Sequence, residues 1–218
     1  MAKLYFRYGA MNSGKSTSLL QAAYNYEERG QRVLIAKPAI DTKDADSVSS
    51  RLGVTRPVDF LVAPDDDLRA LIAEHRSRLR RAEIDTLIPD HGGMVPDVAC
   101  LLVDEAQFLT PTQVDDLLRI VVLDGIPVLA YGIRTDFQTH AFPGSRRVLE
   151  LAHSMEELKT ICRGGRKALF NARLVGGRFV FEGDQVAIDE LSTDRVTYES
   201  MCAECYLRES GGRLDSGV

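Results

Sequence analysis

The hydrophobic positions in the first two thirds of the chain follow two alternating patterns. Short and almost continuous apolar runs occur at five places, and such runs are typical of strands that are buried on both faces of a parallel sheet. Between them lie longer segments in which apolar residues recur every three or four positions, as on one face of a helix. Together these patterns predict an α/β fold for residues 1–154, with a largely parallel sheet flanked by helices. The expected strands are Leu4–Tyr8, Val33–Lys37, Val58–Val62, Val98–Val103 and Ile126–Tyr131.

Three helices are expected between these runs. The first spans Ser16–Glu28 and follows a glycine-containing segment directly. The second and third are recognised by an apolar face, and the third begins after Pro111, which favours the first turn of a helix. The apolar faces consist of Leu68, Leu71, Ile72 and Leu79 in the second helix, and of Val114, Leu117, Leu118 and Val121 in the third.

The pattern changes near residue 155. Residues 155–208 show alternating short strands, a Gly176-Gly177 turn and few helical signals, which predicts a small β-rich domain. Residues 209–218 are polar and contain glycine, so we expect a disordered tail. Thr86–Asp97 contains two prolines and two glycines and is expected to be a loop between a helix and a strand.

Composition narrows the classes of function. The chain has 218 residues, enough for one full domain and a small appendage, and its formal net charge of -5 argues against nucleic acid as the main partner. It has no apolar stretch of the roughly 20 residues that span a membrane and no signal-peptide layout at its N-terminus. Four cysteines are too few for a disulfide scaffold and suit a reducing compartment. We therefore expect a cytoplasmic protein with no membrane partner.

A phosphate-binding pattern follows the first expected strand. The sequence GAMNSGKS fits G-x-x-x-x-G-K-[ST], in which backbone N–H groups surround phosphate oxygens, the lysine reaches the β and γ phosphates, and the last hydroxyl binds Mg²⁺. Its position between a strand and a helix is the context that this chemistry requires. The pattern predicts an ATP site made by Gly9, Ala10, Met11, Asn12, Ser13, Gly14, Lys15 and Ser16, with Lys15 in a catalytic role.

Two adjacent carboxylates complete the predicted site. Asp104 and Glu105 follow the apolar run Val98–Val103 directly. Adjacent residues that leave a strand point in different directions, so the two can serve different purposes. Asp104 is suited to hold Mg²⁺ through water, and Glu105 can accept a proton from an attacking hydroxyl or water. The order of these motifs alone does not distinguish a small-molecule kinase from an ATPase.

Four segments together resemble a known family. LYFRYGAMNSGKSTSLLQAAYNYEERG, LLVDEAQFL, VLAYGIRTDFQ and ELKTIC look like thymidine kinase of the type shared by bacteria and the animal cytosol, with the bacterial branch closer. The resemblance extends from about residue 1 to residue 206, with gaps around Thr86–Asp97 and Asp189–Val196. It implies transfer of the γ-phosphoryl group of ATP to the 5′-hydroxyl of thymidine or deoxyuridine. It also implies a homo-oligomer, either tetramer or dimer, and feedback inhibition by dTTP.

The resemblance assigns roles to individual residues. Glu105 is the expected general base, Asp104 lies on the Mg²⁺ side, and Arg51 in SSRLG matches an arginine near the phosphates. Gln107 is assigned to the nucleotide site. The expected nucleoside pocket consists of Met11, Phe108, Phe137, Phe142 and Tyr198, with Tyr198 on a loop that closes over the base.

The chain departs from the family pattern at two places. The appended domain usually holds a structural zinc through two pairs of ligands and resembles a zinc ribbon, but here only Cys162, Cys202 and Cys205 are present. The partner expected after Cys162 falls in CRGGRK, where Gly164 and Gly165 stand. The fourth ligand could be a distant residue such as His153 or His140, or water, or the cysteines could be reduced thiols without a metal.

The second departure is the closing loop. IDELSTDRVTY is longer than the usual turn, acidic and free of glycine. Close approach of backbone groups to a base favours glycine, so this loop leaves two other functions open. These are a P-loop ATPase in which Glu105 activates water, and an inert nucleotide-binding regulator.

Overall fold

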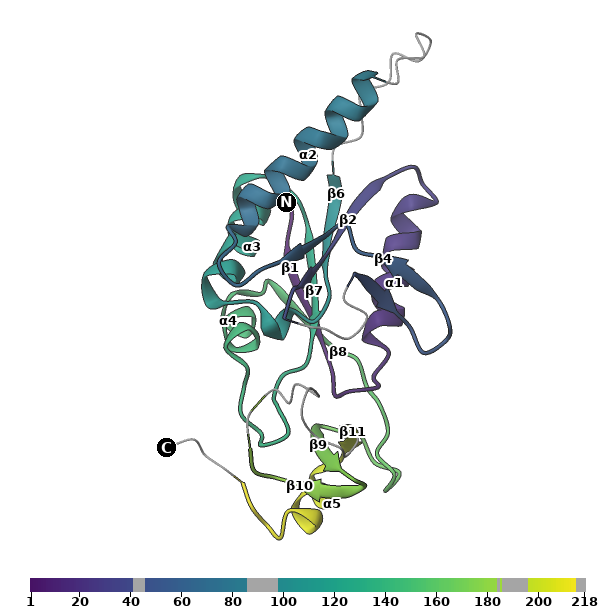
Figure 1. Ribbon diagram of the computed structural model, residues 1–218, viewed down its shortest axis with the longest axis vertical. Coiled ribbons are helices and arrows are strands. Elements are labelled where there is room, and N and C mark those ends of the chain that lie inside the picture. The colour runs from purple at the N-terminus through teal and green to yellow at the C-terminus, as the bar shows by residue number, and fades with distance from the viewer. Residues whose placement is uncertain (41–45, 86–97, 184, 186–195, 215–218) are drawn as a thin grey trace.

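The computed structural model describes residues 1–40, 46–85, 98–183, 185 and 196–214. Six strands form one parallel sheet, in the order β5-β2-β6-β7-β1-β8, at the centre of the larger part of the molecule (Figure 1). The predicted loop at 86–97 and most of the predicted closing loop lie outside the described residues. The strands are β1 (Leu4–Tyr8), β2 (Arg32–Pro38), β5 (Phe60–Val62), β6 (Val98–Val103), β7 (Val128–Gly132) and β8 (Ser154–Glu157).

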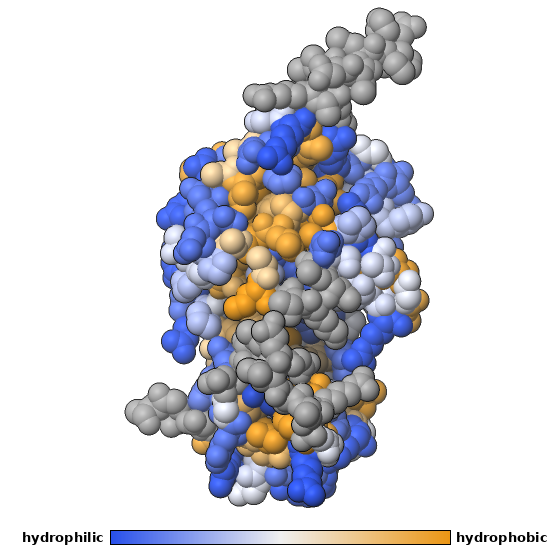
Figure 2. Space-filling model, viewed as in Figure 1, coloured by the Kyte–Doolittle hydropathy of each residue, from blue (hydrophilic) through white to orange (hydrophobic). Residues whose placement is uncertain are grey.

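Helices cover both faces of this sheet. Helix α1 (Lys15–Glu27) lies on one face, and α2 (Leu68–Asp85), α3 (Pro111–Leu123) and α4 (Pro143–Leu151) lie on the other (Figure 1). Side chains alternate along each strand, so Leu101 and Val103 pack toward α3 while Leu102 packs toward α1. In the space-filling view the flanks made by the helices are mainly hydrophilic, and hydrophobic residues gather along the middle of this face (Figure 2). No helix in the described ranges is both long enough and apolar enough to span a membrane.

The predicted α/β class is confirmed, and each of the five expected strands has a counterpart. Strand β8 was not expected, because its sequence SMEE is polar and largely exposed at the sheet edge and therefore gives no apolar signal. It pairs in parallel with β1, so the strand extends across the domain boundary that we expected between residues 154 and 155. A hairpin of β3 (Ser47–Ser49) and β4 (Thr55–Pro57) was also not expected.

The residues after β8 form the smaller unit seen at the bottom of Figure 1. Its antiparallel sheet has the order β10-β9-β11 and comprises β9 (Phe170–Val175), β10 (Arg178–Val180) and β11 (Val196–Met201), followed by helix α5 (Ala203–Glu209). Composition predicted that residues 210–213 belong to a disordered tail. In the structure they continue α5 as turns, because Ser210 N donates to Tyr206 O and Gly212 N donates to Leu207 O. The predicted small β-rich unit is therefore present.

Candidate active site

The phosphate loop connects β1 to α1 at the carboxyl edge of the parallel sheet. Gly14 is the N-cap of α1 and has φ 80°, a left-handed conformation that glycine adopts at little cost. A Cβ atom at Gly9 would lie 2.3 Å from the Leu158 carbonyl oxygen, so only glycine fits between the loop and the chain leaving β8. The N-terminus of the 13-residue α1 thus faces the loop, where its unpaired N–H groups and helix dipole favour an anion.

The Lys15 ammonium lies inside this loop. Its Nζ donates to Ala10 O at 3.1 Å and to Gly9 O at 3.4 Å, and the residue is only 8% exposed. Burial lowers the pKa of Lys15, while the negative charges of Glu105 and Asp104 oppose this shift. The charge of Arg51 also lowers the Lys15 pKa, so the Arg51 guanidinium lies within electrostatic range of the Lys15 ammonium.

Asp104 ends β6 and is buried beside the same edge. Its Oδ1 is inaccessible to solvent and has no hydrogen-bond partner among the described residues. Burial and the neighbouring Glu105 charge raise the pKa of Asp104 to about 7, partly opposed by the charges of Lys37 and Lys15. A buried carboxylate oxygen without a partner fits a metal ligand, and Mg²⁺ prefers such oxygens. Asp104 and the half-buried Ser16 hydroxyl are therefore a suitable pair for Mg²⁺.

Glu105 is held in an unusual conformation by its neighbours. Its φ of 47° is left-handed, which costs a non-glycine residue on the order of 1 kcal/mol and is typical of functional sites. Gln107 Nε2 donates to Glu105 Oε2 at 2.5 Å, and Gln107 Oε1 accepts from Ile133 N at 3.2 Å. Both ends of the Gln107 amide are thus engaged with the protein, so Gln107 links the Glu105 carboxylate to the backbone that follows β7.

The predicted aromatic residues occupy two places. Phe108 lies in the short helix η1 (Ala106–Phe108) and meets Phe142 edge to face, with ring centroids 5.5 Å apart. Phe142 and Phe137 both lie in the segment between β7 and α4, as the sequence predicted for a loop. Phe108 and Phe142 therefore form one aromatic wall, which adjoins Glu105 because Phe108 N donates to Glu105 O at 3.0 Å.

Phe137 has a different environment. It is 1% exposed, and the Arg173 guanidinium lies over its ring at 3.7 Å from the centroid. Arg173 Nε also donates to the Tyr198 hydroxyl at 3.3 Å. Tyr198 lies on β11 and not on a loop. Arg173, which the sequence reasoning missed, therefore joins Phe137 to Tyr198.

The small unit also contacts the phosphate loop directly. Asn171 Oδ1 on β9 accepts from Met11 N at 2.7 Å, and the Ser200 hydroxyl on β11 donates to Met11 O. Asn171 Nδ2 additionally donates to Thr135 O at 3.3 Å, and both side chains are buried. We call Asn171 and Ser200 the loop clamp. The clamp fixes both backbone groups of Met11, so the phosphate loop is built by both parts of the chain.

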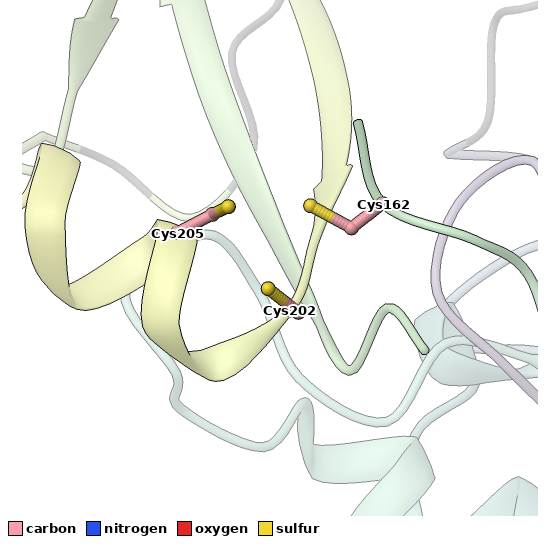
Figure 3. Close-up of side chains that lie close together, drawn as sticks. All are labelled: Cys162, Cys202 and Cys205. Atoms are coloured by element: carbon pink, nitrogen blue, oxygen red, sulfur yellow. The ribbon is translucent and has the colours of Figure 1, made fainter. Parts of the chain in front are cut away.

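Three cysteines gather in the small unit (Figure 3). The sulfur atoms of Cys162, Cys202 and Cys205 all lie within 4.8 Å of one another, and all three residues are buried. Cys202 caps α5 and Cys205 lies in its first turn, while Cys162 precedes β9. Thiol groups at these spacings match three corners of a tetrahedral zinc site. Among the described residues no histidine joins this cluster, so His140 and His153 are not its fourth ligand.

The fold and site together define a class of protein: a P-loop enzyme that uses ATP and Mg²⁺. The thymidine kinase family model matches residues 2–77 and 65–206, and the chain belongs to this family. A thymidine kinase of Chromobacterium violaceum is 44% identical over 94% of this chain and 98% of its own length. A thymidine kinase of Ruegeria pomeroyi is 45% identical over 97% and 96%, and that of Enterobacteria phage T4 is 43% identical over 93% and 94%.

The structure brings together the predicted phosphate loop, Asp104, Glu105 and Arg51 at one edge of the sheet. The residues that sequence reasoning missed are Asn171, Ser200, Arg173 and Lys37. Lys37 could have been noticed, because a charge interrupts the apolar run VLIAKPAI and is buried there. Asn171 and Ser200 give no such signal, because their partner lies about 160 or more positions away.

Proposed function

We propose that this chain transfers the γ-phosphoryl group of ATP to the 5′-hydroxyl of thymidine or deoxyuridine. The observation that supports this most strongly is the pair of unlike carboxylates after β6. Asp104 is buried and its Oδ1 has no hydrogen-bond partner among the residues that the structure describes, and Glu105 is held by Gln107 beside an aromatic wall. An ATPase needs a water-activating base but has no use for an aromatic wall next to it.

Each residue has a separate part in this reaction. Lys15 and Arg51 offset negative charge on the phosphates, and the loop N–H groups hold the phosphate oxygens. Ser16 and Asp104 would hold Mg²⁺, which would supply further neutralisation of the phosphate charge. Glu105 accepts the proton of the 5′-hydroxyl as its oxygen attacks the γ phosphorus.

The base of the nucleoside is bound on the side of the aromatic residues. Phe108 and Phe142 provide apolar contact for a pyrimidine ring. The family resemblance assigns Met11, in the phosphate loop, to the same nucleoside pocket. Arg173 joins Phe137 to Tyr198, and we assign this second aromatic group to the same nucleoside pocket. Of the predicted closing loop, only Val196 and Thr197 are among the described residues before Tyr198.

Family membership supports further parts of the proposal. We infer a cytoplasmic homo-oligomer, tetramer or dimer, with feedback inhibition by dTTP. The net charge of -5 supports a role without nucleic acid. Cys162, Cys202 and Cys205 would hold a structural Zn²⁺, which would stabilise a small unit that has few large apolar core residues.

The test is an ADP-release assay with Mg·ATP and either thymidine, deoxyuridine, deoxycytidine or no acceptor. Glu105→Gln should lower kcat about 10²–10⁴-fold, which is the usual contribution of a general base, and should leave the ATP dissociation constant within a few-fold. Glu74→Gln, in an exposed Arg78 pair on α2, is the matched control and should keep full activity.

Other outcomes would overturn the proposal. ADP release that is independent of any acceptor would identify an ATPase. ATP binding without release in the presence of every nucleoside would identify an inert nucleotide-binding regulator.

A further inference from the structure

The segment between β7 and α4 is fastened to the small unit over four consecutive residues. Each of residues 135–138 shares a hydrogen bond with that unit. The bonds outside position 137 are Asn171 Nδ2 to Thr135 O at 3.3 Å, Gln185 Nε2 to Asp136 Oδ2 at 3.0 Å, and Gln138 Nε2 to Phe181 O at 3.4 Å. The segment leaves the parallel sheet at its carboxyl edge, where α/β sheets bind their ligands. The small unit therefore holds the part of the chain that carries Phe137.

The fourth bond is made to the backbone of Phe137 itself. The Tyr206 hydroxyl on α5 donates to the Phe137 carbonyl oxygen at 2.7 Å. Both residues are buried, so water has little access to either partner. Loss of the hydroxyl would leave a buried carbonyl without this donor, which is more costly than the loss of a hydrogen bond at the surface.

The direction of the Tyr206 hydroxyl is fixed by packing. Its ring lies between two phenylalanines of the small unit, with centroids 5.0 Å from Phe170 and 5.3 Å from Phe181. Tyr206 follows Cys205 in α5, and its backbone N–H donates to Cys202 O at 2.9 Å. The core of the small unit and its cysteine helix thus aim one hydroxyl at the segment after β7.

The small unit holds the phosphate loop with other side chains. The loop clamp of Asn171 and Ser200 bonds the backbone of Met11, whereas the Tyr206 hydroxyl bonds the backbone of Phe137. Met11 lies in the loop that receives ATP, and Phe137 belongs to the aromatic group assigned to the nucleoside. Removal of the Tyr206 hydroxyl is therefore expected to act on nucleoside binding and not on ATP binding.

We infer that Tyr206 is a positioning residue of the nucleoside pocket. Its hydroxyl fixes the Phe137 backbone, and thereby the ring assigned to the pyrimidine base. Helix α5 in this way sets the affinity for the nucleoside, while Lys15 and Glu105 serve the phosphates and the proton transfer. Tyr206 itself exchanges no proton with the substrate. This inference rests on the function proposed above.

The experiment uses Tyr206→Phe, which removes one oxygen atom and keeps the ring between Phe170 and Phe181. ADP release is measured at saturating Mg·ATP with thymidine varied. The KM for thymidine should rise about three- to tenfold, and kcat should stay within about twofold. Calorimetry should show the same factor in the thymidine dissociation constant, measured with a non-hydrolysable ATP analogue present. The dissociation constant of that analogue should stay within about twofold.

The matched control is Tyr24→Phe, the same chemical change at a side chain of α1 that is 60% exposed. Its KM and kcat should equal those of the wild type. A loss of folded protein in Tyr206→Phe would instead lower kcat per mole of chain and leave the KM for thymidine unchanged. The division of the effect between KM and kcat therefore separates positioning from a general loss of structure.

A double-mutant cycle tests whether Tyr206 acts through Phe137. Phe137→Leu removes the aromatic ring but keeps the carbonyl that accepts from Tyr206. In the Phe137→Leu background, Tyr206→Phe should raise the KM for thymidine by less than about twofold, because the ring that the hydroxyl positions is absent. An effect as large as in the wild-type background would mean that Tyr206 acts elsewhere, and would overturn the inference.

Two further outcomes distinguish this inference from the proposed function. If the wild type releases no ADP in response to any nucleoside, the proposed function and this inference both fail. If the wild type is active with thymidine but Tyr206→Phe leaves its KM unchanged, or weakens the ATP analogue by the same factor, this inference alone fails and the kinase proposal stands.

Discussion

The phosphate site and the cysteine cluster are both built at a helix N-terminus, yet they differ in how completely the chain supplies their ligands. At the phosphate site the loop, Lys15, Asp104 and Glu105 are all present, and Asp104 Oδ1 has no hydrogen-bond partner in the part of the chain that the structure describes. At the cysteine cluster three sulfurs are present, and the fourth corner is Gly164.

The difference follows from the chemistry that each site must perform. In a catalytic phosphate site the charged side chains are matched to the charge of the bound phosphates in the transition state. Replacing any one of them is therefore expected to lower turnover. A structural metal needs only to crosslink its chain segments. Three thiolates from two segments would already do so in the proposed zinc site, because the metal would join Cys162 to the pair on α5. The second site can therefore tolerate the loss of a ligand that the first site could not.

The largest expected effect comes from the phosphate site. Lys15→Met should lower kcat/KM for ATP about 10²–10³-fold, because the buried ammonium is lost from the place where the phosphates bind. The zinc content of the purified variant, which measures the proposed zinc site, should equal that of the wild type. Lys159→Met, at an exposed position, is the control. A loss of metal in Lys15→Met would show that the two sites are not independent.

The second prediction concerns how the free energy of unfolding changes with pH. The pKa of Asp104 is raised from 3.8 to about 7 in the folded protein, so between about pH 4 and pH 7 the unfolded chain releases this proton while the folded protein keeps it. The free energy of unfolding therefore falls as pH rises through this window. Asn does not ionise, so Asp104→Asn avoids a buried negative charge in the folded protein and should raise the free energy of unfolding by on the order of 2 kcal/mol at pH 8.

Urea unfolding of the nucleotide-free and Mg²⁺-free protein at pH 5 and pH 8 measures this difference. The gain in Asp104→Asn should be smaller at pH 5, where the wild-type carboxyl still has its proton in the folded state. Turnover should be lost at both pH values. An equal gain at the two pH values would show that the ionisation of Asp104 is not its cause.

The third effect tests the connection between the two regions. Asn171→Ala removes the acceptor of Met11 N and should cost about 1–3 kcal/mol, as expected when a buried donor is left without a partner. It should also lower kcat/KM about tenfold through the shape of the phosphate loop. Asn171→Asp keeps the acceptor for Met11 and loses the donor to Thr135, so it should recover most of kcat/KM. If both variants lower kcat/KM equally, the lost hydrogen bond to Met11 N does not explain the loss of activity in Asn171→Ala.

The smallest effect is expected at the surface of the small unit. Arg166 and Glu204 form an ion pair in which both side chains are more than 60% exposed. Such pairs contribute little, so Arg166→Ala should change the free energy of unfolding by less than about 0.5 kcal/mol in urea unfolding. A larger loss would mean that surface charge, in addition to the cysteine cluster, stabilises this unit.

The parts of the molecule that follow a local rule could be predicted from the sequence. The apolar run of β6 predicted both the strand and the place of Asp104 at its end, and GAMNSGKS predicted the phosphate loop and the start of α1. The sequence CRGGRK also showed that no cysteine or histidine stands just after Cys162, and the structure places Gly164 against the three sulfurs.

The parts that depend on distant partners could not be predicted. Strand β8 has a polar sequence and is a strand only because β1 offers its open edge. Gln107 was assigned to the nucleotide site. In the structure its amide hydrogen-bonds the Glu105 carboxylate and the Ile133 N–H that follows β7, and the sequence pattern did not predict these two contacts. Tyr198 was expected on a loop, and its pairing with Arg173 on β9 makes it part of a sheet. In each case the deciding contact is a tertiary one, which a local pattern does not contain.

The loop clamp has a consequence for how the protein is made. Translation delivers the phosphate loop within the first 16 residues, but the side chains that fix Met11 belong to residues 171 and 200. A growing chain that has left the ribosome as far as β8 contains every strand of the parallel sheet, yet its phosphate loop still lacks both clamp residues. The nucleotide site therefore matures among the last parts of the molecule, although its own sequence is synthesised first.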